Sequence, residues 1–202
     1  VKDAHWTGRN LDPHQLCAPP GKSLHLIRGW SGHPFAMVQG IDDSFGAAAF
    51  VGYHSAAGSG GNPLSHTLSG RMFSRVELNG AVASEFLIYV YAAASVGVPV
   101  IFLSGDSALC DEAKLVVEGI VTVPTLQGIG ASVMSVPPGE AVQRIADGVQ
   151  RAVAAKAVRP LPVPAHFVLR LGFVKATEAY AKSFYPGARQ VSDTEVMLES
   201  ER

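Results

Sequence analysis

Histidines are the side chains of this chain best suited to bind a metal ion or move a proton: His5, His14, His25, His33, His54, His66 and His166. His54 ends an apolar run at residues 47–54, and His66 follows shortly after a glycine-rich stretch. Glu85 opens an otherwise apolar segment, where a carboxylate either points into a site or interacts with a helix N-terminus. Imidazole and carboxylate together suit zinc and, less well, manganese or cobalt.

The spacing of these residues is not that of a local metal motif such as His-Glu-x-x-His. His54 is the best-supported candidate, because open parallel sheets place their ligand sites beyond the carboxyl ends of the strands. His5, in Asp3-Ala4-His5-Trp6, lies at another apparent strand end. The residues alone leave two interpretations open, a metal site and a set of structural histidines.

Short apolar strands alternate with helical patterns along most of the chain. The runs 47–54 and 98–103 are continuous and apolar, as in parallel strands that are covered on both faces. Residues 85–96 and 139–156 are predicted helices, the first buried on most sides and the second amphipathic. This alternation predicts an α/β fold with a mainly parallel sheet and flanking helices.

The segment from Ser55 to Asn62 separates two of the histidines and is rich in glycine, serine and alanine. It lacks the Gly-Lys-Ser/Thr ending of a phosphate-binding loop, so we predict a mobile loop and no nucleotide site. Residues 71–78 alternate in the manner of a strand, and the following Asn79-Gly80 predicts a tight hairpin turn.

Proline residues between Arg159 and Pro164 predict a stiff linker, and we place a domain boundary there. Residues 1–158 are expected to form a metal-binding α/β domain. Residues 159–202 are expected to contain the linker and a smaller, partial α+β domain. Within that part we predict a strand at 166–173, a helix at 177–184 and a final strand at 190–198.

Composition narrows the classes of partner. The chain has 202 residues, a formal net charge of −1 and no cluster of lysine and arginine, so nucleic acid is not an expected partner. No apolar run reaches the roughly 18 residues that a membrane span needs. The cysteines, Cys17 and Cys110, lack Cys-x-x-Cys spacing and are expected to be inert thiols in a reducing compartment.

Several motifs together resemble the D-aminopeptidases, a family of dinuclear zinc peptidases. The stretch 35–45, the strand end Gly52-Tyr53-His54, the motif Leu64-Ser65-His66-Thr67, Glu85 at the start of its helix, and the stretch 98–106 all fall in the order and spacing of that family. The resemblance is densest between residues 34 and 106 and loose after Pro160.

The resemblance implies a role for each candidate residue. His5 would bind the first zinc ion, His54 and Glu85 would bind the second, and His66 would act in catalysis. Asp3 would support His5 from nearby. The family also has an N-terminal strand that ends in an Asp-x-Glu pair of ligands. We expect that this strand and its helix are missing from the 1–158 domain.

The function implied by the resemblance is hydrolysis of short peptides with an N-terminal D-amino acid, such as D-Ala peptides, through a water molecule shared by two zinc ions. The family also implies a cytoplasmic, ring-shaped homo-oligomer such as a decamer. Tyr89, where the family commonly has asparagine, leaves open a related metallo-amidohydrolase that acts on another amide. The absent Asp-x-Glu pair leaves open a non-catalytic relative with an incomplete metal site.

Overall fold

A computed structural model of the chain describes residues 3–6 and 25–201. For residues 3–6, 25, 26 and 28 it describes the backbone alone. His14 and Cys17 lie outside the described residues.

The first large sheet contains the buried centre of the molecule. Its strands, in the order β3-β6-β7-β8, are β3 (Ala48–Tyr53), β6 (Val100–Asp106), β7 (Val121–Ile129) and β8 (Ser132–Ser135). The first three are parallel, and β8 pairs antiparallel with β7. This mixed but mainly parallel sheet with helices confirms the predicted fold class.

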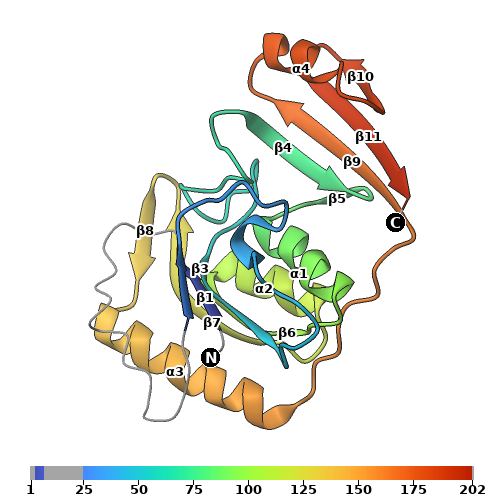
Figure 1. Cartoon of the computed structure of the whole chain (residues 1–202). Coiled ribbons are helices and arrows are strands. Elements are labelled where there is room, and N and C mark those ends of the chain that lie inside the picture. Colours follow the sequence, from blue (N-terminus) through green and yellow to red (C-terminus); the bar gives the residue numbers. More distant parts are fainter. Residues whose placement is uncertain (1–2, 7–24, 202) are drawn as a thin grey trace.

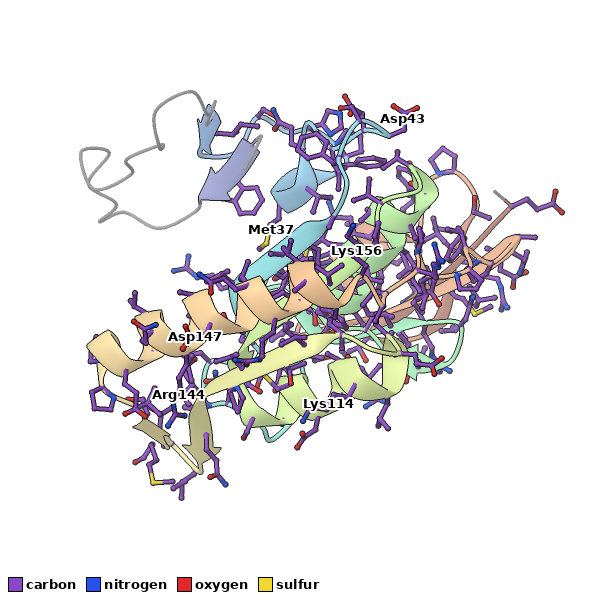
Figure 2. The ribbon with its side chains drawn as sticks, turned by 90° about the horizontal axis from the view of Figure 1, so that it is seen from below. Met37, Asp43, Lys114, Arg144, Asp147 and Lys156 are labelled. Carbon is purple, nitrogen blue, oxygen red and sulfur yellow. The ribbon has the colours of Figure 1, made fainter. Side chains whose placement is uncertain are left out.

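Helices cover this sheet on both sides (Figure 1): α1 (Glu85–Ser95), α2 (Ser107–Val116) and α3 (Pro138–Ala155). The crossovers through α1 and α2 run in one direction along the sheet, which places both helices on the same face. Both α2 and α3 contact β7. Figure 2 shows these helices, with Lys114 labelled on α2 and Arg144 and Asp147 on α3.

Burial differs between the two predicted apolar strands. Every residue of β6 is buried, as predicted. In β3 only Phe50 is buried, so the prediction of a strand covered on both faces is wrong for β3. The reason is its position, because β6 is the one strand among the described residues that pairs with β3.

The second large sheet is antiparallel and has the order β10-β11-β9-β4-β5. Its strands are β4 (Phe73–Leu78), β5 (Ala81–Val82), β9 (His166–Phe173), β10 (Ala188–Ser192) and β11 (Glu195–Glu201), and α4 (Ala176–Lys182) packs against it. The predicted hairpin turn is confirmed, since Asn79 and Gly80 have φ angles of 52° and 81°.

Two features of this sheet were not predicted. The segment 190–198 is not one strand, because a turn after Ser192 folds it into the β10–β11 hairpin. Moreover, β9 from beyond the proline-rich linker pairs with β4 from before it. Residues 73–82 therefore complete the sheet of the C-terminal part, and the domain boundary at residue 158 stays a prediction.

The remaining elements lie near the start of the chain. Strands β1 (Asp3–Trp6) and β2 (His25–Arg28) form a parallel pair, and η2 (Ala36–Val38) is a short 3-10 helix after Pro34. None of the helices in the described residues combines the length and apolarity needed to cross a bilayer.

Candidate metal centre

His54, His66 and Glu85 come together at one end of the first sheet. Each offers a ligand atom, and these atoms lie within 4.8 Å of one another. The two imidazole rings are stacked, with centroids 4.0 Å apart and planes 19° from parallel. The Nε2 atom of His66 lies 3.8 Å from Oε1 of Glu85. The structure thus brings three of the four predicted site residues into one cluster.

Local structure explains two of these positions. His54 follows β3, whose end can approach β6 closely because Gly105 has no side chain; a Cβ there would lie 2.2 Å from the Tyr53 carbonyl oxygen. Glu85 is the first residue of α1, and Ser84 caps that helix by accepting a hydrogen bond from the Leu87 N–H at 3.3 Å.

Glu85 is almost fully buried, at 3% exposure. Its Oε1 atom accepts a hydrogen bond from the Leu68 N–H at 2.9 Å, whereas Oε2 is buried and has no hydrogen-bond partner in the described part of the chain. A buried acceptor without a partner is costly, and a cation would satisfy it. Two imidazoles and a carboxylate are also a donor set that zinc prefers. These residues therefore fit a zinc ion.

The histidine rings are oriented by backbone carbonyl groups. Nδ1 of His54 lies 3.1 Å from the Ser55 oxygen, and Nδ1 of His66 lies 2.8 Å from the Leu64 oxygen. When Nδ1 carries the hydrogen and donates it to the carbonyl, Nε2 is left with a free lone pair. Both rings can then offer Nε2 to a metal ion.

The glycine-rich segment between the histidines, predicted as a mobile loop, is anchored at both ends. Ser55 and Asn62 are buried and hydrogen-bond to the carboxylate of Asp106. Gly61 is needed for this packing, since a Cβ there would lie 2.4 Å from the Ser55 Oγ atom. The composition suggested flexibility, but buried partners outside the segment fix both of its ends.

A cavity of about 390 Å³ opens beside the cluster, lined by Trp30, Ala36, Met37, His54, His66, Leu68, Glu85 and Tyr89. Tyr89 is buried at 3% exposure; burial, and then the Glu85 charge, raise the pKa of its hydroxyl, so it stays neutral at physiological pH. Apart from the three clustered residues, the lining is mostly apolar. Sequence reasoning missed Trp30, Met37 and Leu68, because no pattern marks a cavity wall built from separate loops.

His5 lies in β1, where its backbone pairs in register with Ile27 of β2. Its side chain is not among those described. The roles of His5 and of Asp3 therefore stay predictions.

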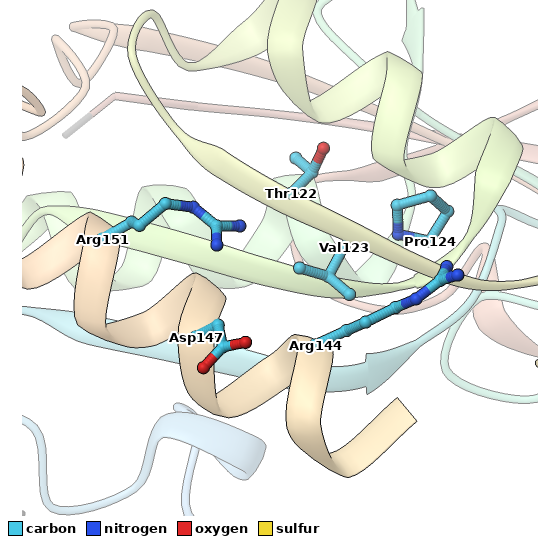
Figure 3. A pocket seen from close by; sticks show the side chains of 6 residues that line it. All are labelled: Thr122, Val123, Pro124, Arg144, Asp147 and Arg151. Carbon is cyan, nitrogen blue, oxygen red and sulfur yellow. The ribbon is translucent and has the colours of Figure 1, made fainter. Parts of the chain in front are cut away.

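A second pocket, of about 210 Å³, lies between β7 and α3 (Figure 3). Its charged residues are Arg144, Asp147 and Arg151. Arg144 pairs with Glu140, and Asp147 accepts a hydrogen bond from Gln143 at 2.9 Å. The lining contains no histidine or cysteine and one carboxylate, so the pocket does not offer the donors of a zinc site.

Comparison with known proteins gives one consistent result. Residues 1–202 match a protein family described as D-aminopeptidase. The D-aminopeptidase of Bacillus subtilis (strain 168) is 30% identical over 191 residues, which are 93% of this chain and 66% of that protein. A solved structure described as the Zn-dependent D-aminopeptidase DppA from Bacillus subtilis, a self-compartmentalizing protease, aligns with a TM-score of 0.81 and 28% identity.

That alignment covers 88% of this chain and 65% of the solved chain. The chain thus spans about two thirds of the length of these relatives. The family match extends over all residues of the chain, which shares the fold of the solved structure. In this chain two histidines and a glutamate come together at one end of the first sheet. The chain belongs to the D-aminopeptidase family.

Proposed function

We propose that the protein is a zinc-dependent aminopeptidase that hydrolyses short peptides with an N-terminal D-amino acid, in particular D-Ala peptides. The observation that carries the proposal is the Glu85 carboxylate, whose buried Oε2 lacks a partner beside the imidazoles of His54 and His66. The relatives described above carry the names of D-aminopeptidases, and one is described as Zn-dependent.

In this proposal the protein binds two zinc ions. His5 is a ligand of the first, and His54 and Glu85 are ligands of the second. Bound zinc would supply Lewis acidity toward the scissile carbonyl and activate a water molecule for attack. The protein's part is to present Nε2 of His54 and a Glu85 oxygen from rigid elements, a strand end and the first turn of a helix.

His66 is proposed to act in catalysis. Its Nδ1 is held by the Leu64 carbonyl, which directs Nε2 toward Glu85 and the cavity. The side chain is 37% exposed, so a substrate can reach it. From this position Nε2 can deliver a proton to the leaving amine or donate a hydrogen bond to the oxyanion of the tetrahedral intermediate.

The cavity supports a small, uncharged substrate side chain. Ala36, Met37 and Leu68 offer apolar contact, and Tyr89 adds a neutral hydroxyl next to Glu85. The same tyrosine supports a second candidate function, hydrolysis of a different amide by a related metallo-amidohydrolase, because its bulk and its hydroxyl change the surface that a substrate meets.

We further propose that the protein assembles into a ring-shaped homo-oligomer, such as a decamer, and acts in the cytoplasm. The description of one relative as self-compartmentalizing supports assembly. Exposed apolar side chains such as Leu115, at 90% exposure, and Val142, at 69%, offer surface for contacts between copies.

The test uses the full-length protein. Zinc per chain is measured by elemental analysis, and release of D-alanine from D-Ala-D-Ala is compared with release of L-alanine from L-Ala-L-Ala. We expect two zinc ions per chain, hydrolysis of the D-dipeptide alone, and loss of activity on chelation that added zinc reverses. Two bound zinc ions without hydrolysis of either dipeptide would favour the amidohydrolase, and a chain that binds no zinc would be the non-catalytic relative.

A further inference from the structure

Asp106, at the end of β6, is fully buried and accepts four hydrogen bonds. Its Oδ1 atom accepts from the Ser55 hydroxyl at 2.5 Å and from the Leu109 N–H at 2.9 Å, which caps α2. Its Oδ2 atom accepts from the Ser55 N–H at 2.6 Å and from the Asn62 side-chain amide at 3.3 Å. A carboxylate is an acceptor only, so all these partners are donors that it can satisfy.

One arm of this network leads to His54. Ser55 is held to Asp106 through both its N–H and its hydroxyl group. The carbonyl oxygen of the same residue lies 3.1 Å from Nδ1 of His54. The carbonyl group that orients the His54 ring therefore belongs to Ser55, the residue that makes two of the four hydrogen bonds to Asp106.

The other arm leads to His66. The Asn62 amide nitrogen donates to Asp106, and its Oδ1 atom accepts from the Leu64 N–H at 2.9 Å. The Leu64 carbonyl oxygen lies 2.8 Å from Nδ1 of His66. The buried Asp106 side chain is thus connected by hydrogen bonds to both Ser55 and Leu64, the two residues whose carbonyl groups contact the histidine rings.

We propose that Asp106 is a positioning residue that sets the tautomer of His54 and His66. It keeps Nδ1 of both rings protonated, so that Nε2 is free to bind the metal ion in His54 and to face the substrate in His66. The inference rests on the zinc site proposed above. Supporting hydrogen bonds of this kind fix which ring nitrogen binds the metal, and their loss typically lowers metal affinity about 10–100-fold.

Asp106→Ala is the central test. It removes the acceptor of the Ser55 N–H and hydroxyl, of the Asn62 amide and of the Leu109 N–H, and so breaks both arms. The metal-free full-length protein is examined by long-range ¹H–¹⁵N correlation of the histidine rings, at a pH where the imidazoles are neutral. We expect the Nδ1–H form for both rings in the wild type and a shift toward Nε2–H, the form that free histidine prefers, in the variant. Zinc affinity should fall about 10–100-fold.

Two further variants separate positioning from general destabilisation. Val196→Ala opens a cavity in the core of the other sheet, where Val196 is fully buried, and should lower the melting temperature without changing the tautomers or zinc affinity. Asn62→Ala breaks one arm alone and should change the His66 ring while the His54 ring keeps its form. If Asp106→Ala does not fold, the tautomer of His66 in Asn62→Ala decides the question.

The inference is overturned if Asp106→Ala keeps the wild-type tautomers and binds zinc within about twofold of the wild type, or if Asn62→Ala keeps the wild-type tautomer of His66. It is also overturned if Val196→Ala reproduces the tautomer change. A wild-type protein that binds no zinc would refute the proposed function instead, and the tautomers of the metal-free protein would still decide the role of Asp106.

Discussion

The two large sheets of this molecule treat polar side chains in opposite ways. Around the first sheet polar groups are buried. All seven buried polar or charged residues in the described part of the chain lie between residues 55 and 106: Ser55, Asn62, Thr67, Ser84, Glu85, Ser104 and Asp106. On the second sheet the charged residues stay at the surface in pairs such as Arg170–Glu195, over a small core that contains Phe173 and Val196.

The difference separates two uses of charge. A buried polar group must find a partner or lose free energy, so a concentration of such groups marks the place where the fold holds side chains for a task. Exposed ion pairs are screened by solvent and contribute little to stability. We therefore expect equal chemical changes to have unequal effects in the two regions.

The largest effect is expected from changing one glutamate near each sheet, Glu85 at the start of α1 and Glu195 in β11. Glu85→Gln keeps an acceptor for the Leu68 N–H but removes the charge and the second carboxylate oxygen. Zinc affinity and hydrolysis should both fall by more than the roughly 100-fold limit typical of supporting residues. Glu195→Gln, on the surface, should leave both within about twofold. Equal losses in the two variants would remove the contrast between the sheets.

Two histidines allow the next comparison. His66→Ala should lower kcat/KM about 10²–10⁴-fold, the range for loss of a general acid or base, while zinc content stays near the wild-type value. His166→Ala is the matched control, because His166 is half-exposed in the second sheet. If zinc is lost from His66→Ala, this residue is a ligand, a role that its place within the 4.8 Å cluster would permit.

Truncation of an aromatic core residue in the second sheet should have the opposite effect, a loss of stability without a loss of zinc affinity. Phe173→Ala empties a buried site in the second sheet and should lower the free energy of unfolding by about 3–5 kcal/mol. Zinc affinity of the folded protein should not change, because Phe173 does not line the cavity and packs in a separate core cluster with Ala179 and Val196. Phe184→Ala, at an exposed position, is the control for denaturant unfolding. A large loss of zinc affinity in Phe173→Ala would mean that the sheets are strongly coupled.

The smallest effect concerns Glu112 on α2, which accepts a hydrogen bond from Ser84 at 2.8 Å. Burial raises the pKa of this carboxyl above its usual 4.5, and the Ser84 hydroxyl offsets the shift in part. Since the folded-state pKa is the higher one, ionisation costs stability at neutral pH, and that cost disappears as the pH falls below 4.5.

Glu112→Gln should therefore raise the melting temperature at pH 7 by no more than about 2–4 °C, the shift that 1 kcal/mol produces in a chain of this size. The gain should vanish in acid. Glu118→Gln, at an exposed position, should show no such gain. A gain that persists at low pH would point to a cause other than ionisation.

Local patterns predicted much of the site. His54 and Glu85 stand where a strand ends and a helix begins, and both boundaries can be read from a few neighbouring residues. The stacking of His66 on His54 could not be read in this way, because buried bonds to Asp106 and Asn62 decide the path of the intervening segment.

The same distinction applies to the fold. The Asn79-Gly80 turn was predictable because both residues favour positive φ angles. The turn after Ser192, at Asp193-Thr194, contains no glycine and neither residue has a positive φ angle, and it was missed. The pairing of β4 with β9 joins segments on either side of the proline-rich linker, and no local pattern records a contact between such distant residues.

Thr67 gives the arrangement a further consequence. Its buried hydroxyl donates to the Ala83 carbonyl at 2.8 Å and accepts from the Ala57 N–H at 3.0 Å. After Thr67 the chain adds β4 and β5 to the second sheet, and it returns to Thr67 at Ala83, just before Glu85. Residues 69–82 thus form an excursion of the chain whose two ends are held together by the hydrogen bond between Thr67 and Ala83. Insertions at its exposed tip, the Asn79-Gly80 turn, should therefore leave the histidine and the glutamate on either side in place.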